Sequence, residues 1–275
     1  MSLIYEPRGP AREYAARAMN HYKGCSHRCT YCYAPAFAYM MEPKEDQQRQ
    51  FNAPRVGGPP DLTDQQRADR IRNSVRNAAP RHANGPRVLM CFTCDPYQDL
   101  EDTHHLTHDI IEILGEAGVP MTILTKNTAR ARNDFDLFVK YGVTLATTIC
   151  WTDDASRNHW EQNASPIEDR FAILDEAREL GLDTWVSLEP IIDYHQALGV
   201  VERLIGRTGV IKIGVVDRRW SPAEHDAIEW DTLGEAVLGL LEPTEQPYYI
   251  KDGLWALMAE EAKERHEKVR GYVPE

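Results

Sequence analysis

The stretch Cys25-Ser26-His27-Arg28-Cys29-Thr30-Tyr31-Cys32 places three thiols in one short loop. Cysteines this close together can wrap around a single metal ion or an iron–sulfur centre. Three thiolates would fill three positions of a [4Fe–4S] cluster and leave one iron open to another ligand. Zinc is the alternative, since His27 in the loop or His21 before it could complete a tetrahedral site. The spacing alone leaves both metals open.

The length and composition indicate a globular protein. The chain of 275 residues is long enough for one large α/β domain or two small ones. Hydrophobic residues make up 42% of it, which is ample for a sizeable core. The formal charge of −12 argues against a broad electrostatic grip on a nucleic-acid backbone and still allows a local basic groove.

Neither a membrane span nor a signal peptide is expected. No apolar run approaches transmembrane length, and Met1-Ser2-Leu3-Ile4-Tyr5-Glu6 lacks the hydrophobic stretch of a signal peptide. We therefore expect a cytoplasmic protein with no membrane partner. In a reducing compartment, clustered cysteines favour metal binding over disulfides.

The chain after the cysteine loop alternates between apolar runs and amphipathic segments. We expect a short helix over 34–41 and a long loop over 43–60. Six strands are expected, one just before Cys25 and the others at 87–92, 121–124, 143–149, 184–188 and 210–214. The remaining expected helices are 63–79, 103–117, 129–141, 166–180, 194–206, 223–241 and 253–268. The alternation predicts βαβ units and a parallel sheet, either doubly wound or a full or partial barrel.

Polar and reactive residues follow the predicted strands at the points where the strands end. In a parallel barrel the active site lies at this carboxyl rim. The residues concerned are Cys25, Thr93-Cys94-Asp95, Thr125-Lys126-Asn127, Thr148, Cys150, Glu189 and Asp217-Arg218-Arg219. We expect the site to be built from them.

The segment 20–34 has the form C-x3-C-x-aromatic-C after a predicted strand, and it closely resembles the cluster loop of the radical S-adenosylmethionine (SAM) superfamily. It is most similar to the branch that contains spore photoproduct lyase and the DNA-repair-photolyase-like proteins. Supporting motifs follow in order, namely Thr93-Cys94-Asp95-Pro96-Tyr97-Gln98, Leu124-Thr125-Lys126-Asn127 and Ser187-Leu188-Glu189-Pro190-Ile191. The family implies an α/β fold, a partial (β/α)6 TIM-like barrel. We expect this barrel over 18–220, with an N-terminal extension over 1–17 and a C-terminal helical extension over 221–275 packed on it.

The resemblance implies a [4Fe–4S] cluster and SAM as cofactors. Cys25, Cys29 and Cys32 would be the cluster ligands, and SAM would bind the open iron. The expected cofactor-binding residues are Tyr31 beside the adenine, Lys126 on the SAM carboxylate, Thr148 near the ribose, and Thr93 and Glu189 at neighbouring strand ends.

The sequence departs from the family where hydrogen would be returned to the substrate. Thr93-Cys94-Asp95 stands where much of the superfamily has a glycine-rich SAM motif. Tyr33 matches a tyrosine that assists hydrogen return in the lyase, but Phe92 holds the position of the lyase's cysteine. Cys91 and Cys94 lie on either side of Phe92. Tyr33 and Cys94 are the catalytic candidates on this basis.

The expected function is reductive cleavage of SAM to a 5′-deoxyadenosyl radical that removes hydrogen from a substrate, with a nucleic-acid lesion or a nucleoside as the first candidate. A reductant such as flavodoxin or ferredoxin would be a partner. Two alternatives stay open: a radical SAM enzyme for a peptide or small metabolite, and a zinc-stabilised binding module without catalysis. Cys91, Cys94 and Cys150 would be buried thiols or ligands of a second cluster.

Overall fold

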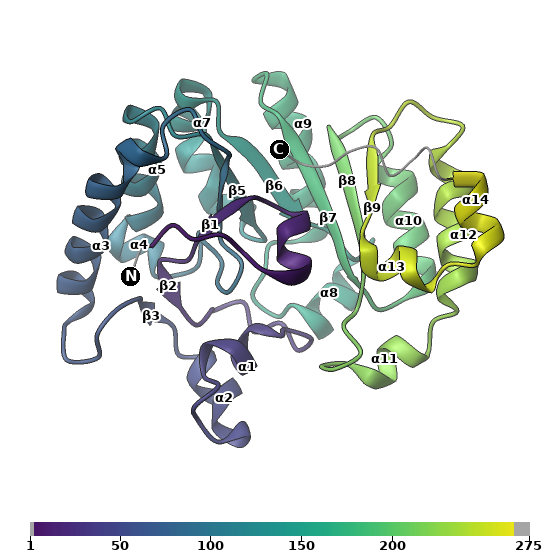
Figure 1. Cartoon of the computed structure of the whole chain (residues 1–275), viewed down its shortest axis with the longest axis horizontal. Helices are drawn as coiled ribbons and strands as arrows, with labels where there is room; N and C mark the ends of the chain where they lie inside the picture. The colour runs from purple at the N-terminus through teal and green to yellow at the C-terminus, as the bar shows by residue number, and fades with distance from the viewer. Residues whose placement is uncertain (1–2, 267–275) are drawn as a thin grey trace.

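The centre of the molecule is a parallel sheet, and the computed structural model describes residues 3–266. Within these residues the main sheet has the order β1-β4-β5-β6-β7-β8-β9, and every neighbouring pair is parallel (Figure 1). The strands are β1 (Arg17–Met19), β4 (Val88–Met90), β5 (Met121–Thr125), β6 (Thr144–Thr148), β7 (Thr184–Ile191), β8 (Val210–Val215) and β9 (Tyr248–Ile250). Because β1 and β9 are the two edges, the sheet is an open, partial barrel.

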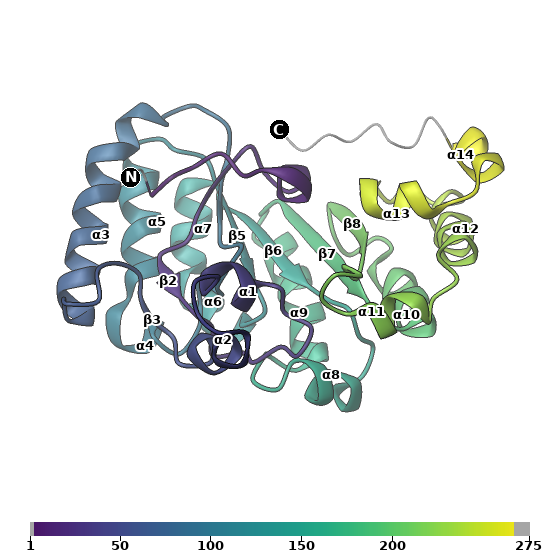
Figure 2. The ribbon, with the colours of Figure 1, turned by 60° about the horizontal axis from the view of Figure 1, so that its bottom comes forward.

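Helices cover the outer face of the sheet, as the βαβ alternation predicts (Figures 1 and 2). The main ones are α3 (Asp64–Ala78), α5 (Leu106–Glu116), α7 (Phe135–Tyr141), α9 (Ile167–Glu179), α10 (Tyr194–Leu204) and α12 (Trp230–Leu241). The chain also forms shorter helices, namely α1 (Ala34–Ala38), α2 (Lys44–Phe51), α4 (Glu101–His104), α6 (Thr128–Ala131), α8 (Asp154–Trp160), α11 (Pro222–Asp226), α13 (Asp252–Leu257) and α14 (Glu260–His266), and α1 and α2 lie below the strands in Figure 1. Thr63 starts α3 as predicted, since its hydroxyl accepts from the Gln66 N–H and the two side chains form a capping box.

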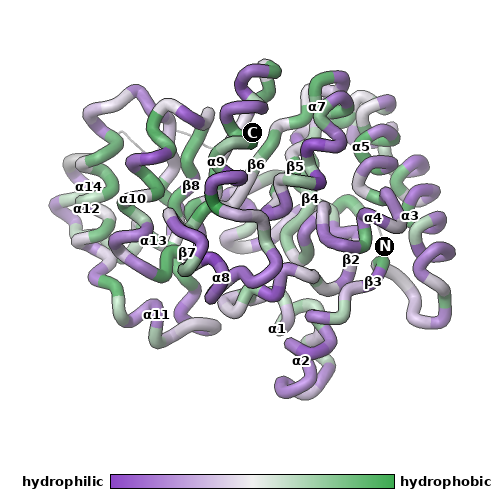
Figure 3. The backbone as a smooth tube through the Cα atoms, turned by 180° about the vertical axis from the view of Figure 1, so that it is seen from behind, coloured by the Kyte–Doolittle hydropathy of each residue, from purple (hydrophilic) through white to green (hydrophobic). Residues whose placement is uncertain are grey.

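The two faces of the sheet carry different side chains, because successive residues of a strand point to opposite faces. Val88 and Met90 on β4 belong to the apolar core under the outer helices. Leu89 between them belongs to a smaller inner cluster that includes Ala146 and Trp185. From behind, the strands and the helix faces beside them are the hydrophobic parts of the chain, whereas α2 is hydrophilic (Figure 3).

The N-terminal segment lies on the inner face of the sheet, between β1 and α13 (Figures 1 and 2). It forms a short 3₁₀ helix, Gly9–Glu13, and then presents Tyr14. The Tyr14 hydroxyl lies 2.9 Å from Ser187 Oγ on β7. The backbone carbonyl of Tyr14 accepts a hydrogen bond of 3.1 Å from Lys212 Nζ on β8. The segment expected as an extension therefore fills part of the barrel interior. The boundaries at 17/18 and 220/221 stay predictions.

The predicted fold is confirmed, with differences near the cysteine loop. The first strand of the main sheet is Arg17–Met19 and does not directly precede Cys25. A two-residue strand, β2 (Tyr22–Lys23), does precede it, but it pairs antiparallel with β3 (Arg55–Val56) in a separate small sheet. The region 43–60 was expected to be a loop and instead contains α2 and β3.

Further differences lie in the connections and in the C-terminal part. Strand β9 was not expected, because three residues are too few for an alternating pattern. Its pairing with β8 adds a seventh strand to the six expected. The C-terminal part, which was expected to be helical, therefore also contains a strand. The helix expected over 103–117 is divided where His105 adopts a left-handed φ of 47°. Helix α8 was not expected, and the helix expected over 223–241 is two helices, α11 and α12.

Within residues 3–266 no helix combines the length and the apolar character needed to cross a membrane.

Candidate active site

The cysteine loop begins at a glycine that no other residue could replace without strain. Gly24 has a φ of +85°, and a Cβ atom there would lie 2.5 Å from the carbonyl oxygen of Phe51. That same carbonyl accepts a hydrogen bond of 3.0 Å from the Cys25 N–H. Cys25 and Cys32 then pack against a small apolar cluster that contains Phe51 and Tyr39. Helix α2, which was not expected, is therefore what supports the loop from outside.

Two side chains from the barrel rim tie the loop to the sheet. Gln98 accepts a hydrogen bond of 3.2 Å from the Ser26 N–H and donates one of 3.2 Å to the Gly24 carbonyl. Asn163 donates a hydrogen bond of 2.7 Å to the Ser26 carbonyl. The loop is thus held over the carboxyl ends of the strands by residues from two separate connections. This is the rim on which the sequence predicted the site.

The three loop cysteines are free thiols, each partly exposed. Burial raises the pKa of the Cys25 thiol well above its usual range and the pKa of Cys29 to about 12. Such thiols keep their protons until a metal replaces them. Among the described residues, no group of three His, Cys, Asp or Glu side chains is arranged to hold one metal ion. A cluster does not require the three thiols to meet at one metal ion, because each cysteine binds its own iron.

The two histidines considered as zinc ligands contact residues outside the cysteine loop. His27 Nδ1 lies 3.3 Å from Asp95 Oδ2. His21 is fully buried, with Nε2 at 2.9 Å from the Thr107 hydroxyl and Nδ1 at 3.5 Å from Cys91 Sγ. Burial lowers the pKa of His21 to about 3, so its ring is neutral. Both ring nitrogens of His21 are therefore engaged away from the loop, whereas His27 Nε2 is buried without a hydrogen-bond partner in the part of the chain that the structure describes.

A buried ion pair that was not predicted lies beside the loop. Glu161 and Arg170 have side chains with 0% exposure, and their charged groups are 2.6 Å apart. The Tyr31 hydroxyl donates a hydrogen bond to the Glu161 carboxylate, and the backbone of Glu161 pairs with that of Cys29. Arg170 Nη1 donates a hydrogen bond of 3.0 Å to the carbonyl of Thr148 at the end of β6. Glu161 therefore joins the cysteine loop to the strand ends.

Lys126 follows β5 and points its ammonium group toward the same place. Its Nζ lies 5.8 Å from the centre of the Tyr31 ring. Burial lowers the pKa of Lys126, but the neighbouring Cys29 and Glu161 outweigh this effect and hold the pKa above its usual value. Its charge is therefore present at neutral pH. The predicted residues Tyr31, Lys126 and Thr148 thus surround one corner of the rim together with the three cysteines.

The predicted relay residues lie at the end of β4. Tyr33 is 40% exposed, and its hydroxyl donates a hydrogen bond of 3.1 Å to the Phe92 carbonyl. Cys94 is buried, and burial together with the neighbouring Cys94 raises the pKa of the Cys91 thiol. Asn20 Oδ1 accepts from the Phe92 and Thr93 N–H groups at 2.8 and 2.9 Å and so fixes this turn.

The three remaining cysteines do not gather in the described structure. Cys91 adjoins Cys94 and His21, whereas Cys150 lies near Glu161 and Lys126. Cys91 and Cys94 therefore have different neighbours from Cys150, so a second cluster of these three thiols is not supported. Burial raises the pKa of Cys150, as expected of a buried thiol.

Glu189 lies on β7 and contacts two residues that are distant in sequence, Tyr14 and Lys251. Its carboxylate accepts hydrogen bonds from the Tyr14 hydroxyl and from Lys251 Nζ, the latter at 2.5 Å. Lys251 also lies 3.9 Å from Glu13, which in turn accepts from the Asp252 N–H. The sequence predicted Glu189 but neither of its partners, because nothing local marks residues 14 and 251 as neighbours.

Comparison with known proteins identifies the family and the fold of the chain. The family model of the Radical SAM superfamily matches residues 19–195. An uncharacterized protein of Mycobacterium tuberculosis is 28% identical over 211 residues, which cover 72% of this chain and 58% of that protein. One of Methanocaldococcus jannaschii is 27% identical over 195 residues, which cover 70% of this chain and 66% of the relative. This chain therefore spans little more than half the length of the mycobacterial relative.

Two solved structures resemble the chain in fold. Streptococcus suis SuiB bound to S-adenosylmethionine has a TM-score of 0.58 and 12% identity, with 88% of this chain and 52% of SuiB covered. Spore photoproduct lyase complexed with dinucleoside spore photoproduct has a TM-score of 0.52 and 16% identity, with 87% of this chain and 65% of the lyase covered. At these identities the likeness concerns the fold alone.

Proposed function

Because the chain belongs to the radical SAM superfamily, as the match over residues 19–195 shows, we propose that it cleaves SAM reductively at the carboxyl rim of the barrel. The superfamily works with a [4Fe–4S] cluster and SAM, and these are the cofactors of this enzyme. When bound, they supply a 5′-deoxyadenosyl radical that removes hydrogen from a substrate. The observation that carries the proposal is that the cysteine loop contacts Glu161 and Lys126 on one rim. Tyr31 and Cys29 of the loop contact Glu161, and the Tyr31 ring lies beside Lys126.

The side chains of the rim have separate tasks in this proposal. Cys25, Cys29 and Cys32 hold the cluster. The Lys126 ammonium pairs with the SAM carboxylate, and the Tyr31 ring lies against the adenine. Further contacts to SAM come from residues at the neighbouring strand ends, namely Thr93, Thr148 and Glu189. The N-terminal segment and the cysteine loop cover the interior and keep water from the radical.

Lys126 gives the sharpest test of cofactor binding. Lys126→Ala should weaken SAM binding about tenfold to a hundredfold, because a charged hydrogen bond contributes roughly 1.5–3 kcal/mol. Iron content should stay unchanged, since Lys126 is not a cluster ligand. Anaerobically reconstituted protein is titrated with SAM, and dithionite-dependent formation of 5′-deoxyadenosine and methionine is followed.

The matched control for this test is Lys140→Ala, since Lys140 is an exposed lysine on α7. It should bind SAM as the wild type does. An unchanged dissociation constant in Lys126→Ala would remove Lys126 from the site. Colourless wild-type protein with one zinc per chain, and no 5′-deoxyadenosine, would instead identify a binding module.

We propose a nucleic-acid base, in a lesion or a nucleoside, as the substrate class. Three exposed aromatic rings, those of Tyr33, Phe37 and Trp220, support this substrate class. The centre of the Phe37 ring on α1 lies 5.7 Å from the centres of the other two rings. Exposed rings beside a binding site are typical platforms for stacked bases. A peptide or small metabolite is the other candidate. Deuterated nucleosides, oligonucleotides and peptides are offered in turn, and the true class is the one that transfers deuterium to 5′-deoxyadenosine.

Cys94 and Tyr33 are proposed as the route by which hydrogen returns to the substrate. The Cys94 S–H would supply the hydrogen atom and the Tyr33 O–H would restore the thiol. One electron from the reductant and one proton from solvent would then return the resulting Tyr33 radical to its O–H form. A reductant such as flavodoxin or ferredoxin supplies the electrons for cleavage. Cys94→Ala and Tyr33→Phe should keep iron and SAM binding and slow product formation about tenfold or more, which corresponds to ~1.4 kcal/mol in the barrier.

The readout is a substrate radical that persists in electron paramagnetic resonance spectra of the two variants. Tyr39→Phe is the control, because Tyr39 packs under the loop and away from Cys94. If both relay variants form the wild-type product at the wild-type rate, hydrogen does not travel through them.

A further inference from the structure

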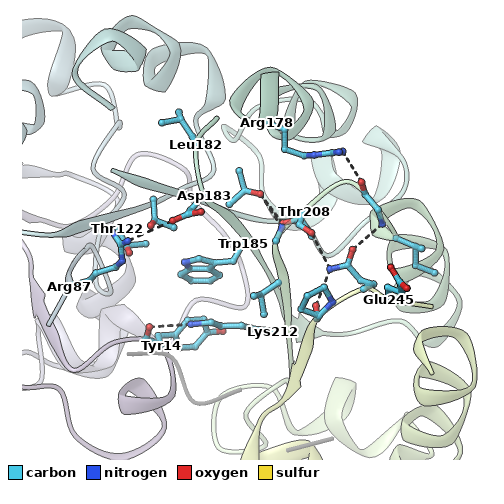
Figure 4. Close-up of a pocket in the computed structure, with 18 of the residues that line it drawn as sticks. Tyr14, Arg87, Thr122, Arg178, Leu182, Asp183, Trp185, Thr208, Lys212 and Glu245 are labelled. Carbon is cyan, nitrogen blue, oxygen red and sulfur yellow. Dashed lines mark hydrogen bonds and ion pairs between the residues drawn. The ribbon is translucent and has the colours of Figure 1, made fainter. Parts of the chain in front are cut away.

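A cavity of about 950 Å³ lies at the amino ends of the strands, on the rim opposite the cysteines (Figure 4). Its walls come from the starts of β5 to β8, from Tyr14 and Ala15, and from the turn at 244–247 before β9. None of the cysteines lines it. A volume of this size would hold a small organic ligand. The cofactors do not account for it.

Lys212 on β8 is the unusual residue of this cavity. Its side chain is 2% exposed, and its Nζ donates one hydrogen bond of 3.1 Å to the Tyr14 carbonyl. The ammonium lies 4.2 Å from the centre of the Trp185 ring. No carboxylate among residues 3–266 forms an ion pair with it, since Glu189 and Glu13 are both engaged with Lys251.

A buried cation without a counterion is costly, so such a group either loses its proton or acquires an anion. Burial and, to a smaller extent, the charge of Lys251 lower the pKa of Lys212 to about 7, and the opposing effect of Glu13 is smaller still. The amine is therefore poised between its two forms. An anion in the adjoining cavity would hold it in the charged form.

The remaining walls suit a ligand with a polar and an apolar side. Thr122 on β5 and Thr144 on β6 are register partners, and both line the cavity. Trp185 stands in the middle of it, and Leu182 closes one side (Figure 4). The hydroxyl groups and Lys212 reach the cavity from different strands, with the indole between them.

We propose that this cavity is a second ligand site, separate from the cysteine rim, which takes a small organic anion, a carboxylate or a phosphate monoester. Its charged end would pair with Lys212, and its apolar body would lie against Trp185 and Leu182. The site does not depend on the SAM chemistry proposed for the other rim.

The test uses benzoate and phenyl phosphate as probes, with neutral benzamide as the isosteric comparison. Binding to the cluster-loaded chain is measured by calorimetry. At least one anion should bind about tenfold to a hundredfold more tightly than benzamide, the range expected for one charged hydrogen bond. Tight binding of benzoate alone would indicate that the site takes a carboxylate. Tight binding of phenyl phosphate alone would indicate that it takes a phosphate ester.

Three variants locate the binding. Lys212→Met should lower the affinity for the anion to that for benzamide. Lys140→Met, on the surface, should leave the affinity for the anion unchanged. Lys126→Ala should also leave it unchanged, because Lys126 lies on the opposite rim. The proposal is overturned if neither anion exceeds benzamide in wild-type protein, a comparison that holds even where Lys212→Met does not fold. Equal anion binding by Lys212→Met and Lys140→Met would overturn it as well.

Discussion

Replacing Cys25, Cys29 or Cys32 by Ala is expected to abolish both iron loading and SAM cleavage. A cluster held by three thiolates cannot keep its position and its open iron after losing one of them. Each variant is reconstituted anaerobically, its iron is counted, and 5′-deoxyadenosine is measured after addition of dithionite. The loss should be complete, since the chemistry depends on the cofactor and not on the protein scaffold.

The control is Cys91→Ala, which removes a buried thiol near His21 without touching the loop. It should load as much iron as the wild type. A Cys29→Ala protein that still cleaves SAM after reconstitution would show that the ligands are assigned wrongly.

Glu161→Gln is expected to cost about 3–5 kcal/mol in the free energy of unfolding, because it leaves Arg170 charged and unpaired in the interior. Chemical denaturation under anaerobic conditions measures the change. The double variant Glu161→Gln, Arg170→Met should recover much of the loss, since no buried charge then remains alone. A single variant as stable as the wild type would mean that water reaches the pair.

An exposed ion pair provides the comparison. Glu168 on α9 pairs with Arg203 at 2.7 Å, but the Glu168 side chain is 75% exposed. Glu168→Gln should therefore change stability little, because exposed pairs contribute little. The contrast separates the effect of burial from that of a charge change on the same part of the molecule.

The parts of the site that the sequence predicted are the ones with local signals. The cysteines are marked by their spacing, and Lys126 is marked by its position directly after an apolar run. Thr148 and Glu189 follow from the same rule, that carboxyl ends of parallel strands meet at one rim. Each of these residues could be placed without knowing what it contacts.

The missed residues are those defined by contacts across the chain. Arg170 did carry a signal, because it lies on the buried face of α9 between Ile167 and Phe171, where an arginine needs a buried partner. Nothing local identifies Glu161 as that partner. Tyr14 is likewise separated from Ser187 by 173 positions and has no motif around it. Strand β9 was missed because its pairing with β8, and not its length, makes it a strand.

The contacts of Glu13 and Tyr14 also bear on how the enzyme is made. Glu13 accepts hydrogen bonds from the Tyr249 hydroxyl and the Asp252 N–H, which follow it by more than two hundred residues. Until the ribosome has added residue 252, Glu13 lacks both of these partners. The cysteine loop is complete more than two hundred residues earlier. A nascent chain therefore presents the three proposed cluster ligands before the contacts that hold Glu13 across the barrel can form.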